Sequence, residues 1–303
     1  MRGRDLVDYA TLSLVWGVSF VVLLKVVRAF GWVGAVSFRA LIAGGILLAV
    51  AAVTKHRLDF SVGWWPFAVV GATTVAGQLI GMSYATPRVG TAMAAIIVGT
   101  IPLFSLLIGH LWGLERMTGT GWLGLPLGLA GIVLLVGFPA QPVTGAFVGG
   151  CAAALAGAIC AAYGSNYARR RLRRLGSWEV STGSFLLGGV MTLPLVLVVP
   201  VPMAPRPVDF GYLLLLGGVM SALAYVLFFR LVADVGATRA ISVEVVVTAV
   251  AVMVGALLLR EPISGLQILG GAVIIAGCSL VLGLVPARRW WPRRWAAHRR
   301  SET

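Results

Sequence analysis

Two stretches of this chain share one layout. GTAMAAIIVGTIPLFSLLIGHLWGLERMT runs from residue 90 to 118, and GATRAISVEVVVTAVAVMVGALLLREPIS runs from residue 236 to 264. Without a gap, Gly90 aligns with Gly236 and Glu115 with Glu261, at an offset of 146 residues. The same offset pairs Gly109 with Gly255, Gly124 with Gly270, Gly131 with Gly277 and Gly137 with Gly283. These matched glycine and acidic positions indicate that one unit has been duplicated.

A shorter pattern repeats near the start of each half. WGVSF at 16–20 and YGSNY at 163–167, here called the first box and the second box, both read aromatic, Gly, any residue, small polar, aromatic. On a helix the two aromatic residues of each box are i,i+4 neighbours and share one face. If a twofold axis relates the halves, we expect the two boxes to face each other across it.

The composition is that of a membrane protein. The chain has 303 residues, of which 59% are hydrophobic and 11% are charged, whereas a soluble domain carries about 25% charged residues. The mean hydropathy is +0.96. Apolar runs close to 20 residues long recur along the chain, and each is long enough to cross a bilayer core of ~30 Å as a helix. We therefore predict an all-α polytopic membrane protein.

The apolar runs predict ten membrane helices in two groups of five. The first group spans about 8–27, 33–53, 64–84, 90–112 and 121–138, and the second spans about 145–168, 180–200, 210–230, 239–259 and 265–285. Because five is odd, the second group enters the membrane from the opposite side, which gives the inverted repeat found in many secondary transporters. We expect a first five-helix repeat at 1–140, a second at 141–287, and a basic cytoplasmic tail at 288–303.

The positive charges predict the orientation. With both termini in the cytoplasm, 18 Lys and Arg residues lie inside and five outside, and Arg39 lies within the second helix. Such an imbalance favours this orientation by the positive-inside rule. We expect a multi-pass protein of the cell (plasma) membrane, whose tail RRWWPRRWAAHRR rests on the inner leaflet.

The net charge of +14 does not indicate nucleic-acid binding. Five arginines fall in RRRLRR at 169–174 and six in the tail, beside predicted membrane helices. Such clusters fix topology or touch anionic lipid. The three cysteines lie in apolar runs without metal-ligand or disulfide spacing. We expect no metal and no cofactor.

Several motifs resemble those of one transporter family. WGVSF is similar to the Trp-Gly-Ser-x-Phe opening of EamA-type members of the drug/metabolite transporter superfamily. Arg39 in the second helix, Pro102 in the fourth, and the helix ends GLERMT (113–118) and LREPIS (259–264) fit the same family. The resemblance covers nearly the whole chain. It implies a transporter of small solutes such as amino acids, metabolites or drugs, frequently directed outward.

Polar and aromatic residues within the predicted helices are the candidate substrate ligands. They are Trp16, Ser19, Phe20, Gln78, Tyr84, Thr100, Tyr163, Asn166, Tyr167, Tyr225 and Ser242. Aromatic walls with a few hydrogen-bonding groups suit an amphiphilic small molecule. Aromatic residues and glycine also occur where helices simply pack together. The pattern leaves these two interpretations open.

Charged residues inside a membrane are costly and mark functional sites by default. Glu244 lies about five residues into the ninth helix, at a position that family members usually fill with an uncharged residue. A carboxylate there can take up a proton or bind a cationic group, or it can form a structural ion pair with Arg239 or Arg230. Arg39 either extends to the headgroups or faces the cavity and attracts a carboxylate. Pro102 removes a helical hydrogen bond, which makes the fourth helix a candidate hinge.

These observations favour a secondary transporter of the drug/metabolite type, working by alternating access and able to couple to protons at Glu244. The expected partners are a small-molecule substrate, membrane lipid and protons, with the chain acting as a monomer or a weak homodimer. An enzyme is not expected, because acidic residues and histidines are scattered rather than clustered. A lipid or isoprenoid-type flippase and a non-transporting scaffold are the alternatives.

Overall fold

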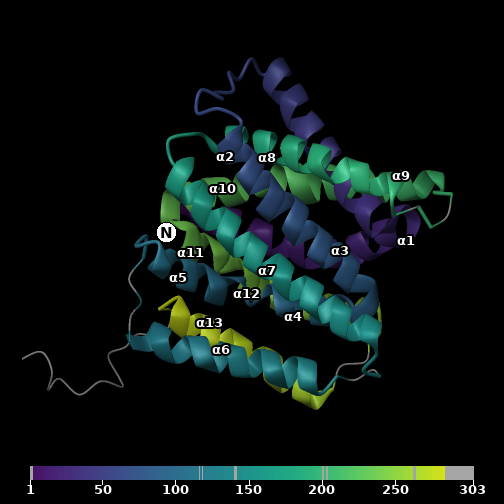
Figure 1. Cartoon of the computed structure of the whole chain (residues 1–303), viewed down its shortest axis with the longest axis vertical. Coiled ribbons are helices and arrows are strands. Elements are labelled where there is room, and N and C mark those ends of the chain that lie inside the picture. The colour runs from purple at the N-terminus through teal and green to yellow at the C-terminus, as the bar shows by residue number, and fades with distance from the viewer. Residues whose placement is uncertain are drawn as a thin grey trace, which may run out of the picture.

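Helices make up all the regular structure in the described part of the chain. The computed structural model describes residues 3–115, 117, 119–139, 142–199, 201–202, 204–261 and 264–283. Helices α1 to α13 follow one another along these residues, with short π-helical and 3-10 segments between some of them (Figure 1). The predicted all-α class is therefore confirmed, while the expected tail at 288–303 lies outside the described residues.

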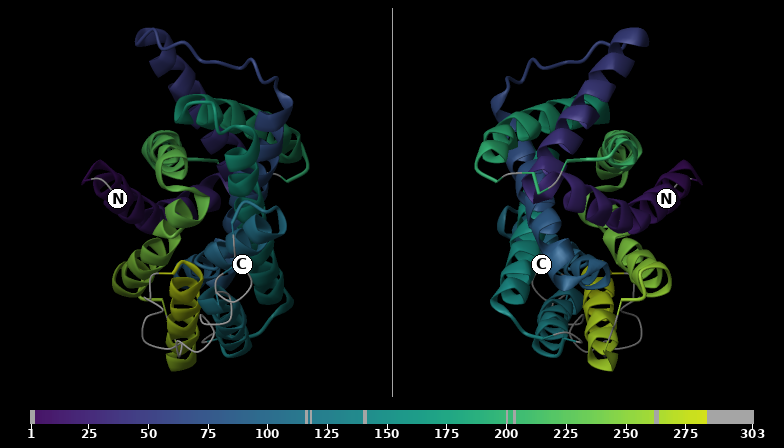
Figure 2. Two further views of the ribbon diagram at one scale, coloured as in Figure 1. Left: turned by 90° about the vertical axis from the view of Figure 1, so that its left-hand side faces the viewer. Right: turned by 90° about the vertical axis from the view of Figure 1, so that its right-hand side faces the viewer.

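The first helix, α1 (Gly3–Val53), consists of two arms. They meet at Gly31, whose φ of 73° and ψ of 166° are non-helical and are readily adopted only by glycine. Figure 2 shows the arms diverging from this point. The predicted helices 8–27 and 33–53 are these two arms.

The remaining predicted helices also have counterparts. Eight segments of the described residues are long and apolar enough to cross a membrane, the first being both arms of α1, and Gly265–Val281 is a shorter apolar helix. The elements after α1 are α2 (Trp65–Val70), η1 (Gly71–Gly77), α3 (Gln78–Val89), α4 (Thr91–Val98), α5 (Ile101–Leu111), α6 (Gly119–Gly137), α7 (Gly145–Arg171), α8 (Ser177–Thr192), η2 (Leu193–Leu197), α9 (Pro207–Gly217), η3 (Gly218–Leu223), α10 (Ala224–Val235), α11 (Ala237–Ile241), α12 (Val243–Leu258) and α13 (Gly265–Val281). With the arms of α1 taken separately, ten apolar helical segments result, as predicted.

Two of the predicted helix ends were placed too early. The third and eighth helices were expected to end at 84 and 230, but α3 and α10 run to Val89 and Val235. The residues that end them are Gly90 (φ 88°, ψ 161°) and Gly236 (φ 89°, ψ 157°). These two glycines lie 146 residues apart and share one left-handed conformation. In α3 the helix continues through Pro87 and Arg88, and in α10 it continues past Arg230 and Asp234.

The last helices of the two halves, α6 and α13, lie side by side (Figures 1 and 2). A Cβ atom added at Gly124 would lie 2.6 Å from the Gly277 carbonyl oxygen, and one at Gly270 would lie 3.0 Å from the Gly131 carbonyl oxygen. The offset of 146 converts the first contact into the second. Backbones therefore approach closely at two related places, through the small residues that membrane helices use for packing.

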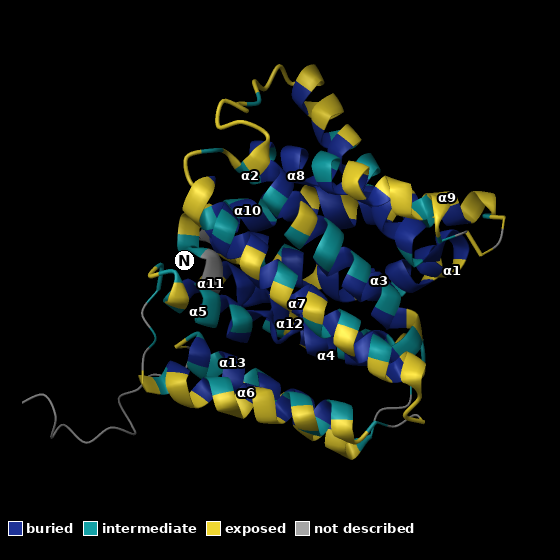
Figure 3. Cartoon of the chain, in the orientation of Figure 1, coloured by how far each residue is buried: buried dark blue, intermediate teal, exposed yellow. Residues whose placement is uncertain are grey.

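Large apolar side chains are exposed on the outer helices (Figure 3). Examples are Leu123 and Val133 on α6 and Phe210 and Leu214 on α9. Exposed apolar surface on this scale is typical of a lipid-facing protein rather than of one surrounded by water. Arg39 and Glu244, described below, are buried between the helices instead.

Candidate substrate site

A cavity between the two halves brings together most of the predicted residues of helices α1, α3, α10 and α12. It is lined by Trp16, Ser19, Phe20, Arg39, Gln78, Leu79, Met82, Val98, Tyr225, Glu244 and Val247. Its volume is about 20 Å³, which is room for about one water molecule. We call it the central cavity. In this conformation the helices must separate before a substrate fits.

Two opposite charges are buried at this cavity. Arg39, on the second arm of α1, is 3% exposed, and Glu244, in the first turn of α12, is 5% exposed. Among the described residues neither forms an ion pair with the other or with a third residue. An unpaired buried charge costs several kcal/mol. The arrangement is therefore one that a bound group of complementary charge stabilises.

Arg39 is held by a π-helical turn rather than extended toward the headgroups. Its Nε donates a hydrogen bond to the Ser221 hydroxyl, which in turn donates to the Leu216 carbonyl at 2.7 Å. Ser221 lies in η3, where the wider π-helical winding places the hydroxyl beside Arg39. Among the described residues only Nε of Arg39 donates a hydrogen bond, so the two terminal nitrogens of the guanidinium are available to a ligand.

Glu244 does not form the ion pair with Arg230 that the sequence left open. Arg230 bonds to Asp8, its Nε donating to Oδ2 at 2.9 Å. No ion pair between Glu244 and Arg239 occurs in the described part of the chain either. Thr248, one turn along α12, donates to the backbone carbonyl of Glu244 at 2.7 Å, and the Glu244 carboxylate has no hydrogen bond to any described residue.

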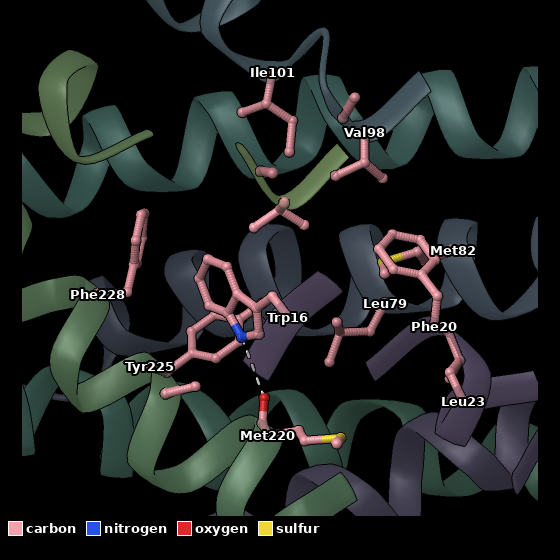
Figure 4. Packing of buried hydrophobic residues seen from close by; sticks show 14 of the residues in the cluster. Trp16, Phe20, Leu23, Leu79, Met82, Val98, Ile101, Met220, Tyr225 and Phe228 are labelled. Atoms are coloured by element: carbon pink, nitrogen blue, oxygen red, sulfur yellow. Dashed lines mark hydrogen bonds between the residues drawn. The ribbon is translucent and has the colours of Figure 1, made fainter. Parts of the chain in front are cut away.

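The first box supplies an aromatic wall of the central cavity (Figure 4). The Trp16 indole N–H donates to the Met220 carbonyl at 3.2 Å, and its ring lies 5.2 Å from that of Tyr225. The Tyr225 hydroxyl reaches Oε1 of Gln78 at 3.4 Å. Figure 4 shows Phe20 on the other side of Trp16 from Tyr225. Four predicted ligands thus converge on one site.

The aromatic residues of the second box do not face the first box, which corrects our expectation. Tyr163 packs against Trp112 at a centroid distance of 5.0 Å and stacks with Tyr167 at 6.2 Å. Instead, Ala161 and Ser165 of α7 line a small cavity that adjoins the central one and shares Trp16, Gln78, Tyr225 and Glu244 with it. The face of α7 that carries the two tyrosines therefore points elsewhere.

Other predicted ligands make structural contacts outside the central cavity. Asn166 is fully buried, and its amide donates to the Ser105 hydroxyl at 2.9 Å and to the Ala162 carbonyl at 2.9 Å, which ties α7 to α5. The guanidinium carbon of Arg88 lies over the ring of Tyr84, 3.6 Å from the ring centroid. For both residues, substrate binding stays a prediction.

The break in the fourth predicted helix lies at Gly99 and Thr100, between α4 and α5. The Thr100 hydroxyl donates to the Ile97 carbonyl at 2.6 Å, and Pro102 sits in the first turn of α5, where its missing N–H is tolerated. The second half has a break four residues earlier in the repeat, before α12, where Ser242 donates to the Arg239 carbonyl at 2.6 Å. A hinge at Pro102 remains a prediction.

Several lining residues were not predicted. They are Leu79, Met82, Val98 and Val247 in the central cavity and Thr74, Ile101, Ala161, Ser165, Phe228 and Ile241 in the adjoining one. The apolar ones carry no signal in a sequence that is apolar nearly throughout. Thr74 had a usable signal in the sequence, because it lies about one helical turn before Gln78. In the structure its buried hydroxyl has no hydrogen-bond partner within the described residues.

Together, the fold and the site define a polytopic helical membrane protein with a polar cavity between its two halves. The sequence profile of the EamA-like transporter family matches residues 9–137 and again residues 148–283. The chain belongs to this family.

Known proteins agree with that assignment. The chain is 28% identical over 290 residues to a protein of Escherichia coli K12 named uncharacterized inner membrane transporter YedA, covering 91% of each chain. It is 26% identical over 217 residues to a probable terminal-alkyne amino-acid exporter of Streptantibioticus cattleyicolor, covering 71% of each chain. A solved crystal structure, 20% identical, superposes with a TM-score of 0.67 over 95% of this chain and 99% of that one. The last comparison shows that the fold is shared.

Proposed function

We propose that the protein is a secondary transporter that exports a small zwitterionic solute, such as an amino acid, by alternating access. The observation that carries this proposal is the pair of buried opposite charges, Arg39 and Glu244, which line one cavity and form no ion pair with each other. Relatives named as transporters, one of them an amino-acid exporter, support the general class.

The ligand chemistry follows from the two charges. The unused terminal nitrogens of Arg39 present the planar, bidentate geometry that carboxylates prefer. The Glu244 carboxylate suits an ammonium group. Between them, Trp16 and Phe20 offer an aromatic surface to an apolar side chain. A molecule that carries both charges satisfies both residues at once, whereas a simple amine or acid leaves one of them uncompensated.

The same glutamate provides a route to proton coupling. A buried carboxylate without a counter-ion is stable when it is protonated or when a cation replaces the proton. Exchange of a proton for the ammonium group of the substrate at Glu244 would link the two fluxes. Export then draws on the inward proton gradient.

The moving parts are the two halves, which we assign as repeats at 1–140 and 141–287, followed by the tail at 288–303. The matching glycine ends of α3 and α10 and the related α6–α13 contacts support this division. So do the π-helical turns η1 and η3, which precede α3 and α10. Rocking of one half against the other opens the central cavity to each side in turn. The charge distribution supports cytoplasmic placement of both termini.

Reconstituted protein tests the proposal. Proteoliposomes with and without an imposed pH gradient are assayed with radiolabelled amino acids, together with the matching decarboxylated amines and N-acetylated acids. We expect gradient-driven flux of at least one amino acid, and at least tenfold weaker flux of its amine and its N-acetyl form. A transported amine that needs no carboxylate would contradict the zwitterion site.

Three variants assign the roles. Glu244→Gln keeps the size of the side chain and removes its charge, so flux should lose its dependence on the pH gradient. Arg39→Ala should abolish flux, and Arg39→Lys should retain part of it. Glu179→Gln is the matched control, because Glu179 is an equally buried carboxylate outside the central cavity. If Glu244→Gln transports with unchanged pH dependence, coupling does not reside at this residue.

A further inference from the structure

A much larger cavity lies at one end of α7, α8 and α10. Its volume is about 300 Å³, which is enough for a small solute. The last turn of α7, the start of α8 and the last two turns of α10 form its walls. We call it the basic cavity. In the orientation favoured by the charges, these helix ends lie at the cytoplasmic side.

The basic cavity and the small cavity beside the central site are lined by residues of the same helices. On α7, Ala161 and Ser165 line the small cavity next to the central one, whereas Ala168 and Leu172, the residue that follows the helix, line the basic cavity. Successive spacings of three and four residues place all of them on one face of the helix. The same helix face thus runs from the binding site to the basic cavity.

Helix α10 shows the same continuity and supplies a barrier. Tyr225 and Phe228 line the small cavity, whereas Phe229 and Val232 line the basic one. The rings of Phe228 and Phe229 contact each other with centroids 5.4 Å apart. These two aromatic side chains therefore stand between the two spaces.

Two arginines give the basic cavity its charge. Arg169 and Arg173 both line it. Arg169 forms an ion pair with Glu115, but Arg173 forms none among the described residues. The neighbouring Arg174 belongs to the same run but does not line the cavity. One uncompensated positive charge is thus directed at a space whose other walls are largely apolar.

We propose that the basic cavity is the cytoplasmic access chamber of the transport pathway, in which Arg173 attracts the carboxylate of the substrate before it passes Phe228 and Phe229. The proposal rests on the transport function proposed above. It identifies Arg173 as a specificity-determining residue and small carboxylate-bearing solutes as the ligand class. A buried lipid phosphate at the same arginine is the competing occupant, and the experiments separate the two.

The first experiment measures access and charge without any transported substrate. Ser177, at the start of α8, lines the basic cavity, and Ser177→Cys changes a single side-chain atom. In a background lacking Cys151, Cys160 and Cys278, inside-out vesicles are treated with an anionic and a cationic methanethiosulfonate reagent. We expect Ser177→Cys to react, and to favour the anionic reagent. Adding Arg173→Gln should lower this preference about three- to tenfold, because one nearby unit charge is lost, while adding Arg174→Gln should not.

Failure to react from the cytoplasmic side, or equal effects of the two arginine substitutions, would overturn the proposal. If Ser177→Cys does not insert, Ala233→Cys on the α10 wall of the cavity replaces it. Lipid occupancy predicts a different pattern. Cysteine labelling would then be slow in vesicles containing anionic phospholipid and fast in vesicles of phosphatidylcholine alone, which also overturns the access chamber.

The second experiment uses flux of the amino acid found in the proteoliposome screen, measured from the cytoplasmic face. Arg173→Gln should raise the half-saturation constant about threefold or more with little change in maximal rate, and 0.5 M salt should remove the difference by screening. Arg174→Gln should match the wild type. An unchanged constant in Arg173→Gln would refute the chamber while leaving the transport function intact. Absence of wild-type flux would instead refute the transport function, and the labelling ratios would still decide the nature of the cavity.

Discussion

Glu115 and Glu261 occupy matching places in the two halves, and each joins its own helix end to another helix. The Glu261 carboxylate accepts hydrogen bonds from the Thr91 amide at 2.8 Å, the Thr91 hydroxyl at 2.9 Å and the Ala92 amide at 2.9 Å, and so caps the start of α4. Glu115 forms an ion pair with Arg169, at the wall of the basic cavity. The Glu261 carboxylate thus bonds to the start of α4, and the Glu115 carboxylate bonds to an arginine that lines the basic cavity.

The backbones around these two residues nevertheless agree. The Glu115 amide donates to the Gly109 carbonyl at 3.1 Å, and the Glu261 amide donates to the Gly255 carbonyl at 3.3 Å. The duplicated unit thus supplies a common backbone frame, whereas the side chains placed on it differ between the halves. The charged residue of the central site is one of the side chains that differ, since Glu244 has Val98 as its counterpart at the offset of 146.

The largest effect is expected from breaking the symmetric frame. Gly124→Val and Gly270→Val each place a β-branched side chain against the backbone of the facing helix, at 2.6 Å and 2.9 Å from its nearest atoms. Overpacking of this kind costs about 1–3 kcal/mol or more. We expect both variants to lose the folded monodisperse state in detergent to a similar extent, as measured by thermal unfolding and size-exclusion chromatography.

Gly137→Ala is the control for that pair, because a Cβ atom there meets nothing within 4 Å. It should unfold like the wild type. If Gly124→Val were destabilising and Gly270→Val harmless, the two contacts would not be equivalent, and the symmetric frame would be wrong.

The next largest effect separates the two boxes. Trp16→Ala removes an aromatic wall of the central cavity, and we expect the half-saturation constant for the transported amino acid to rise at least tenfold. Tyr163 is 36% exposed and lies away from that cavity, so Tyr163→Ala should change the constant less than twofold. Flux assays on both variants, normalised to protein inserted, make the comparison. Equal effects would restore the second box to the substrate site.

This comparison also shows what the sequence could predict. Charge inside an apolar run is conspicuous, so Arg39 and Glu244 were identified without a structure. The number of helices followed from hydropathy for the same reason. The direction of a helix face was harder to predict, because a shift of one residue turns it by about 100°. Matching residue types paired the boxes at an offset of 147, whereas the offset of 146 pairs Ser19 with Ser165. Ser19 lines the central cavity, and Ser165 lines the small cavity that shares residues with it.

A moderate effect tests the contact of Glu261 with α4. Glu261→Gln weakens three hydrogen bonds to a charged acceptor at the start of α4, and hydrogen bonds to charged groups contribute about 1.5–3 kcal/mol. We therefore expect Glu261→Gln to lower the melting temperature relative to the wild type in the same detergent. An unchanged melting temperature would mean that these hydrogen bonds do not stabilise the fold.

The smallest effect compares the two serines that the offset of 146 brings into register. The Ser19 hydroxyl donates to the Trp16 carbonyl at 2.7 Å within its own helix, so it is already occupied and Ser19→Ala should leave the half-saturation constant nearly unchanged. The Ser165 hydroxyl has no hydrogen bond within the described residues, although its residue lines the small cavity beside Glu244. Its hydroxyl is free to bond to a ligand, and one neutral hydrogen bond contributes about 0.5–1.5 kcal/mol.

Ser165→Ala should therefore raise the half-saturation constant about two- to tenfold in the same flux assay. If only Ser19→Ala raised the constant, Ser19 rather than Ser165 would bind the substrate. The first half, rather than the second, would then supply this hydrogen bond.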